Sequence, residues 1–181
     1  MEFTLPEIIA TTEKLDLSYR TVFASGSDSG VVNSLIALFQ LLDEDKILSY
    51  ITKLITSNVN LDLSKWIDEE FSSRGFNLGK NKSERFLVTK FLLENFIKDP
   101  SLPIGLGHSW YPRNNLQNFL NDFFNTFYRE LKFMLIDLRV KAELNESKNI
   151  SEQIITNIVL GGTVQNVQAK NIDKSEFTQN E

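Results

Sequence analysis

The chain has no cysteine and a single histidine, His108, and this shortage restricts the chemistry that it can perform. Without cysteine there are no disulfides, no thiolate metal ligands and no cysteine nucleophile. One histidine does not supply the usual ligands of a zinc site, and a catalytic histidine needs a nucleophile and an orienting carboxylate. The sequence shows no such pairing. We therefore expect no metal site, no cofactor, no catalytic residue and no enzymatic activity; an enzyme centred on the loop around His108 is the remaining alternative.

Concentrated basic charge and long apolar runs are also lacking. The net charge is −5, and acidic and basic residues are spread along the chain, whereas a nucleic-acid-binding surface needs a basic stripe. No run approaches 18 uninterrupted apolar residues, so we expect no stable membrane span. The start Met1–Pro6 has neither the basic nor the apolar part of a signal peptide. These features predict a cytoplasmic protein that binds no nucleic acid.

What the chain has instead is phenylalanine and helical periodicity. It contains 14 Phe beside 2 Trp and 4 Tyr, and 41% of its 181 residues are hydrophobic, which predicts one domain with a core built largely on phenylalanine. Apolar residues recur at the i, i+3, i+4, i+7 spacing of amphipathic helices. The expected helices span about residues 5–17, 31–42, 43–58, 63–72, 83–98 and 115–146. The predicted fold class is therefore mainly α, a bundle of five or six helices over residues 1–147.

One long loop interrupts the helical pattern between residues 99 and 113, where three prolines and two glycines prevent a helix. This loop carries Trp110, Tyr111 and Arg113, which are residue types that dominate binding hot spots. They are candidate partner-binding residues. The alternative is that Trp110 and Tyr111 only hold the proline-rich loop against the helices.

The segment 115–146 is the longest periodic stretch of the chain. Its main stripe consists of Leu116, Phe119, Leu120, Phe123, Phe127, Leu131, Met134, Leu135 and Leu138, while Phe124, Phe133, Ile136 and Val140 are predicted to point elsewhere. A helix of about 45 Å that is apolar on more than one side is either the centre of a bundle or shared with a partner chain. Phe124 and Phe133 are therefore candidate residues of an oligomer interface. On this interpretation the protein would be a structural subunit of a larger assembly, such as a phage or secretion apparatus.

The end of the chain differs in composition from the rest. Residues Asn157–Ile172 are rich in β-branched and amide side chains, contain no proline and are nearly uncharged, which is typical of a segment that pairs as a strand. A turn or bulge is expected near Gln165 and Asn166, where the alternation of apolar and polar residues is broken. We therefore predict a strand-forming interaction tail over residues 148–181. The candidate partner-binding residues of this tail are Val164, Gln165, Asn166, Val167, Gln168 and Ile172.

The string Gly162–Ile172, with its Gly-Thr-Val and Val-Gln-Ala segments, resembles the short amyloid-signalling motifs of bacteria. Such motifs are terminal appendages on small helical or enzymatic domains that work with NLR-like defence proteins. The resemblance implies a bacterial adaptor or effector that self-associates or pairs with a protein partner in signalling or antiviral defence. The glycine-rich, histidine-bearing part that often closes these motifs is absent, and the chain ends in Asp173–Glu181 instead. An ordinary strand-mediated homo-oligomer, or a tail that forms no strand, is the alternative.

Overall fold

The structure is a computed structural model that describes residues 2–63, 78–102, 115–145 and 149–161. It confirms the predicted class, since the described chain is mainly α. In chain order the elements are β1 (Glu2–Thr4), α1 (Leu5–Ala24), α2 (Asp28–Glu44), α3 (Lys46–Asn58), α5 (Lys82–Lys98), α7 (Asn115–Phe119), η1 (Leu120–Phe124), α8 (Asn125–Leu144), β2 (Asn149–Ser151) and α9 (Glu152–Leu160). The helix expected at 63–72 lies largely outside the described residues, as does most of the proline-rich loop.

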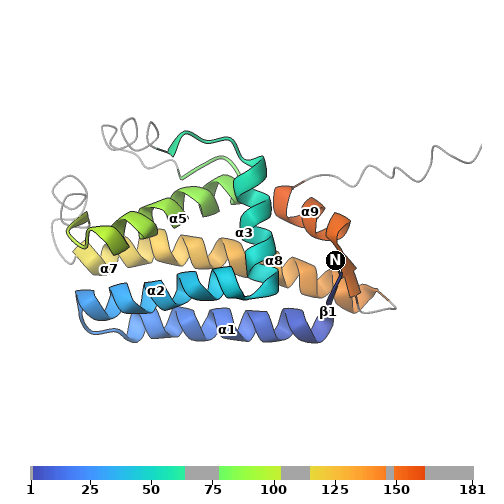
Figure 1. Cartoon of the computed structure of the whole chain (residues 1–181), viewed down its shortest axis with the longest axis horizontal. Helices are drawn as coiled ribbons and strands as arrows, with labels where there is room; N and C mark the ends of the chain where they lie inside the picture. Colours follow the sequence, from blue (N-terminus) through green and yellow to red (C-terminus); the bar gives the residue numbers. More distant parts are fainter. Residues whose placement is uncertain (1, 64–77, 103–114, 146–148, 162–181) are drawn as a thin grey trace, which may run out of the picture.

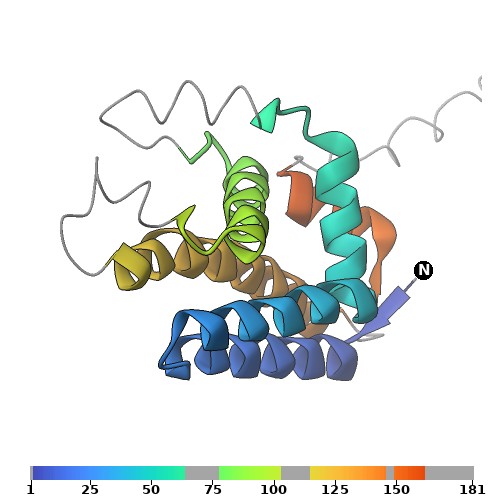
Figure 2. The ribbon, with the colours of Figure 1, turned by 60° about the vertical axis from the view of Figure 1, so that its left-hand side comes forward.

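The long helix formed by α7, η1 and α8 is the centre of the bundle. It packs against α1 on one side and α5 on another, while α2 packs against both α1 and α5. Figure 1 shows α1, α2, α5 and α8 lying roughly along the long axis, with α3 running steeply across this direction next to the start of α5. Turning the molecule shows α9 close to α3 (Figure 2), in agreement with the packing of α9 against α3 and α8.

Polar side chains fix the helix starts, largely where the sequence predicts. Ser27 caps α2 by accepting a hydrogen bond from the Gly30 backbone N–H at 3.2 Å, and Asn81 caps α5 by accepting one from the Glu84 N–H at 2.9 Å. At the start of α1, Thr4 and Glu7 form a capping box, in which each side chain accepts a hydrogen bond from the other's backbone N–H. Helix α1 extends to Ala24, seven residues beyond the predicted end at residue 17.

The core is rich in phenylalanine, as predicted, although leucine is the more frequent residue among its described buried side chains. The largest fully buried side chains include Phe3, Phe86, Phe96, Phe119, Phe123, Phe124 and Phe127. Several of these rings contact one another at distances typical of favourable aromatic pairs, such as 5.1 Å between the centroids of Phe86 and Phe127 and 5.2 Å between those of Phe96 and Phe119. Aromatic packing therefore joins α5 to the long helix along much of its length.

The long helix contains one π-helical turn, η1, in which the Asn125 N–H donates to the Leu120 carbonyl instead of to Asn121. A π turn accommodates one extra residue and widens the helix locally. Leu120, Phe123 and Phe124 of this turn are all buried. The widened turn therefore lets three side chains of one turn be buried at once, at the point where α1 and α5 both contact the helix.

The first and last parts of the described chain meet in a small two-stranded sheet. The sequence did not predict its first strand, β1. Strand β1 pairs antiparallel with β2, and Phe3 lies opposite Ile150. Both side chains are buried in the main core. The sheet therefore joins residues 2–4 and 149–151, which are far apart in the sequence, at the end of the bundle where α9 begins.

The tail prediction is corrected at its start. Asn157 and the residues up to Leu160 belong to helix α9, not to a strand. Ile155 and Val159, one helical turn apart, are fully buried in the same core as the other helices. The helical domain was expected to end at residue 147. Residues 149–160 also pack into the bundle, so the described domain extends beyond that boundary.

Candidate functional site

The structure shows how the chain leads into the string Gly162–Ile172, although the candidate partner-binding residues of the tail lie outside the described residues. These are Val164, Gln165, Asn166, Val167, Gln168 and Ile172. The loop residues His108, Trp110, Tyr111 and Arg113 also lie outside them. What the structure describes is helix α9, which comes directly before the string, and the surface of the long helix.

Helix α9 is held in the bundle by packing and by one buried hydrogen bond. Its inward side chains, Ile155 and Val159, have no exposed surface. The hydroxyl of Ser83, in the first turn of α5, donates to the backbone carbonyl of Val159 at 2.7 Å. Carbonyls in the last turn of a helix have no partner within the helix, so this bond satisfies one of them and ties the end of α9 to α5.

A glycine ends α9 directly before the tail. Gly161 has a φ of 71°, in the left-handed region that glycine adopts without the steric cost of a Cβ. The backbone therefore turns out of the helix at Gly161, and Gly162, the first residue of the motif-like string, comes next. Helix α9 and its C-terminal glycine therefore lie directly before the string in the sequence.

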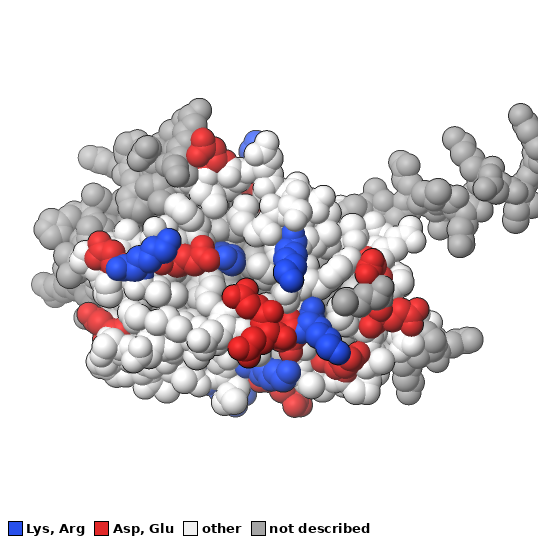
Figure 3. Space-filling view, in the orientation of Figure 1, with Lys and Arg blue, Asp and Glu red and all other residues white. Residues whose placement is uncertain are grey.

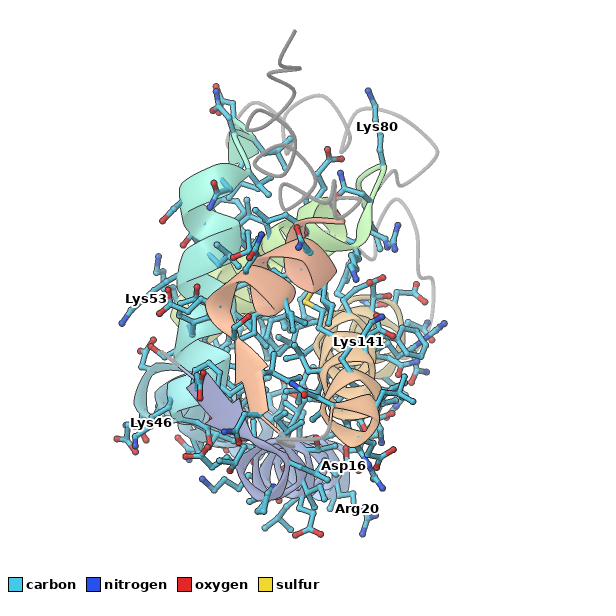
Figure 4. All side chains as sticks on the ribbon, turned by 90° about the vertical axis from the view of Figure 1, so that its right-hand side faces the viewer. Asp16, Arg20, Lys46, Lys53, Lys80 and Lys141 are labelled. Carbon is cyan, nitrogen blue, oxygen red and sulfur yellow. The ribbon has the colours of Figure 1, made fainter. Side chains whose placement is uncertain are left out.

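The outer face of α8 is a second candidate surface. Four large apolar side chains are exposed along it: Phe133 at 49%, Ile136 at 40%, Val140 at 46% and Leu144 at 76%. Their spacing of three or four residues places them on one side of the helix. In Figure 4, the side of α8 that faces away from α1 and α9 is covered by none of the helices and strands that the structure describes. We refer to these four residues as the α8 stripe.

The two phenylalanines predicted at an oligomer interface lie in different environments. Phe133 belongs to the exposed stripe, but the prediction is wrong for Phe124, which is fully buried. The Phe124 ring packs on Tyr19 and Phe23 of α1, with centroid distances of 5.5 and 5.6 Å. Phe124 and Phe133 are nine residues apart, and at about 100° per residue this puts them half a turn out of phase, on opposite faces.

Charged residues border the α8 stripe. The Arg129 guanidinium lies over the Phe133 ring, 5.7 Å from its centroid, at one end of the stripe. At the other end, Arg139 donates to Glu143 at 2.8 Å. Lys82 of α5 lies 3.6 Å from Asp137 along the side of the stripe. The stripe is thus an apolar row with Arg129 near its start and the Arg139–Glu143 ion pair near its end.

A polar cluster joins the inner edge of α8 to α1. The Tyr128 hydroxyl donates to Asp16 at 2.7 Å, and the Lys132 ammonium donates to the Tyr128 oxygen at 2.8 Å and to the Asp16 carboxylate at 2.9 Å. Burial raises the pKa of Tyr128, and hydrogen bonds to Tyr128 and Asp16 raise the pKa of Lys132. Every charge in the cluster has a partner, so its role is to hold α8 against α1.

Asp45 is a second polar residue that is buried between helices. Its carboxylate accepts hydrogen bonds from the Thr11 hydroxyl, the Lys14 ammonium and the first backbone N–H groups of α3. Burial acts to raise the pKa of Asp45, but the hydrogen bonds from Lys14, the Leu48 N–H and Thr11 outweigh it and hold the pKa below its usual value. The group caps α3 and joins it to α1.

A shallow groove of about 390 Å³ lies between α2 and α5. Its apolar part comes from Ile36, Phe39, Leu42 and Ile97, and its polar part from Gln40, Asp43, Lys90, Glu94 and Lys98. Lys90 is bonded to Glu94 and lies over the Phe39 ring. Figure 3 shows acidic and basic side chains interleaved along this face, with no large area of one sign. The groove therefore offers no concentrated charge for a charged ligand.

The described residues contain no group of three or more His, Asp or Glu side chains arranged to hold a metal ion. Among the helices that the structure describes, none has the length and apolarity needed to cross a membrane. Comparisons with protein-family models, with curated proteins and with solved structures find no match to this chain.

Sequence reasoning found part of the α8 stripe. It placed Phe133, Ile136 and Val140 off the main apolar face, and it assigned only Phe133 of these to an interface. It missed Leu144, whose signal is its position one turn after Val140. It also missed the α2–α5 groove, which gives no signal in the sequence because it is formed by two helices about fifty residues apart.

Proposed function

We propose that the protein is a non-enzymatic interaction module, an adaptor or effector, that assembles through the strand-forming string Gly162–Ile172. The observation that carries the proposal is the position of this string. It begins one residue after Gly161, where a helix that is buried in the core and bonded through Ser83 comes to its end. The folded bundle thus supplies a fixed attachment point for a short segment of strand-forming composition.

The chemistry of the string favours pairing between chains. Val164, Val167 and Ile172 supply apolar side chains, and amide side chains lie between them. Stacked copies of such a segment would align amide ladders and dry apolar rows, whereas a single partner strand would use the backbone hydrogen bonds of β-augmentation. The resemblance to bacterial amyloid-signalling motifs supports the first mode and a role in defence signalling.

The test is the mass in solution of three chains measured by light scattering: the full chain, a chain ending at Ile172 and a chain ending at Gly161. We expect the first two to form oligomers or fibrils and the third to remain at a much smaller mass. Fibre diffraction with reflections near 4.7 and 10 Å would identify stacked strands. Equal masses for all three chains would contradict the proposal.

The truncation must retain α9. A chain ending at Asn149 would remove Ile150, Ile155 and Val159, all of which are buried. Any change in mass would then reflect a damaged core as well as a missing tail. The substitution Val167→Lys in the full chain is the milder variant, because it places charge in an apolar row while leaving residues 2–161 intact; it should also prevent assembly.

A second candidate function is that of a structural subunit in a larger assembly, with the long helix as the interface. The exposed α8 stripe favours it. The two candidates differ in one measurable respect: association through the tail is lost when the chain ends at Gly161, whereas association through α8 persists.

A further inference from the structure

We propose that the α8 stripe is a self-complementary docking surface for a second copy of this chain, with the two α8 helices packed antiparallel about a two-fold axis. The proposal does not depend on the tail, since every residue in it lies within the folded bundle. It assigns an interface to an exposed apolar surface that no described helix or strand covers.

The first observation is the concentration of exposed apolar groups. Six large hydrophobic side chains are exposed in the described part of the chain, and four of them form the α8 stripe. Single exposed apolar residues are normal on protein surfaces, but a contiguous row is typical of an interface. The opposite face of the same helix is buried by α1 and α5, so the stripe is additional to the apolar surface that the fold needs.

The second observation is the symmetry of the stripe. Its midpoint lies near Leu138, between Ile136 and Val140. A two-fold axis through this midpoint places Ile136 of one copy beside Val140 of the other. It also brings Phe133 close to Leu144 of the other copy. Antiparallel packing therefore covers all four side chains with apolar partners and leaves none of them facing water, which is how a two-fold interface is built.

The charges favour the antiparallel arrangement over the parallel one. Arg129 lies over the Phe133 ring at one end of the stripe, and Glu143 lies at the other end. Antiparallel helices place the Arg129 guanidinium of each copy near Glu143 of the other, and they oppose the helix dipoles. Parallel helices would stack Arg129 on Arg129 and Glu143 on Glu143, which is unfavourable.

Two other charged groups beside the stripe have a partner within the same copy, since Lys132 is bonded to Asp16 and Asp137 is paired with Lys82. Glu143 already accepts a hydrogen bond from Arg139 of its own copy. In the dimer Glu143 would therefore be shared between Arg139 and the Arg129 of the other copy.

The size of the stripe sets the expected affinity. A stable protein complex buries about 800 Å² on each partner, and one helix face with four apolar side chains supplies less. We therefore expect a weak dimer, with a Kd of roughly 10 μM or higher, that becomes populated when another contact raises the local concentration.

Engineered disulfides test the geometry directly, because the natural chain has no cysteine. Two single variants, Phe133→Cys and Leu144→Cys, are made in the full chain that carries Val167→Lys, so that the tail does not assemble, and are oxidised separately and as a mixture. Antiparallel packing predicts a disulfide between the two different variants when they are mixed. Each variant alone should cross-link poorly, since its two copies of the residue lie about 16 Å apart along the helix, beyond the reach of a disulfide. Leu17→Cys, an exposed position on α1, is the control for random collision.

Efficient cross-linking of each variant with itself, in place of the mixed product, would overturn the antiparallel arrangement. Cross-linking of all variants at the rate of Leu17→Cys would overturn the interface. A reduced chain that sediments as a monomer at 500 μM would also overturn it.

Sedimentation of charge variants is the second measurement. Arg129→Glu and Glu143→Arg should each raise the dimer Kd about two- to fivefold for each charge pair that is lost. The double variant should return the Kd to near its wild-type value. Failure of the double variant to recover would contradict the proposed pairing. Val140→Lys should abolish the dimer while leaving the free energy of unfolding nearly unchanged, which separates loss of the interface from loss of the fold.

Discussion

The Ser83 hydroxyl donates a hydrogen bond of 2.7 Å to the backbone carbonyl of Val159, 76 residues later in the chain. Both groups are buried, and the bond joins the first turn of α5 to the last turn of α9. It links α5 to the segment that leads into the string Gly162–Ile172. The local stability of α9 therefore depends on a residue in a distant helix.

We expect Ser83→Ala to lower the free energy of unfolding by about 1–2 kcal/mol, because the Val159 carbonyl would remain buried without its partner. Amide hydrogen exchange in α9 should accelerate more than exchange in α1. Ser57→Ala, at an exposed position in α3, is the control and should change the stability by less than about 0.5 kcal/mol. An equal effect of both substitutions would show that the Ser83 bond contributes nothing.

The two phenylalanines of the long helix should respond differently to truncation. Phe124→Ala removes a fully buried ring that packs on α1 and should cost about 3–5 kcal/mol in chemical denaturation. Phe133→Ala removes a half-exposed ring and should cost less than about 1 kcal/mol. Measurement of both variants at low protein concentration excludes any contribution from association. A large cost for Phe133 and a small one for Phe124 would reverse the assignment of core and surface.

Gly79 occupies a backbone conformation and a space that only glycine tolerates. Its φ is +118°, and a Cβ added there would lie 2.6 Å from the Cβ of Glu84. Gly79→Ala should therefore destabilise the start of α5 by about 1–3 kcal/mol, measured as a lower Tm. Gly26→Ala, where an added Cβ meets nothing within 4 Å, is the matched control. It should be neutral or slightly stabilising, since alanine restricts the unfolded chain.

The stability of the fold should depend on the ionisation of Asp45. The pKa of this buried carboxyl is below its usual value in the folded state, so the unfolded state binds protons more readily. The stabilisation is thus complete above about pH 4 and is lost as the pH falls through the lower folded pKa. Asp45→Asn should cost about 1–3 kcal/mol at pH 7 and progressively less below pH 4.

Urea unfolding of Asp45→Asn and the wild type at pH 7 and pH 3 tests this expectation. Asp43→Asn, which changes an exposed residue of the preceding helix, serves as the control and should show little effect at either pH. A difference between Asp45→Asn and the wild type that is the same at both pH values would contradict a role for the charge.

The helices were predictable from the sequence because they depend on local spacing and local capping. Apolar residues at helical intervals and capping groups such as Ser27 and Asn81 act within a few positions of one another, and the structure contains both features. The phenylalanine core was predictable for a related reason, since large apolar side chains have to be buried somewhere in a domain of this size.

Only the tertiary structure decided which apolar faces are core. Phe124 and Phe133 belong to the same helix and have the same side chain, but α1 supplies Tyr19 and Phe23 to cover the first, and no described element covers the second. Likewise, the composition of Asn157–Leu160 favours a strand, and burial of Ile155 and Val159 among α3, α5 and α8 makes it a helix. A local pattern specifies what an element is, whereas burial depends on which distant segment packs against it, and that information is not local.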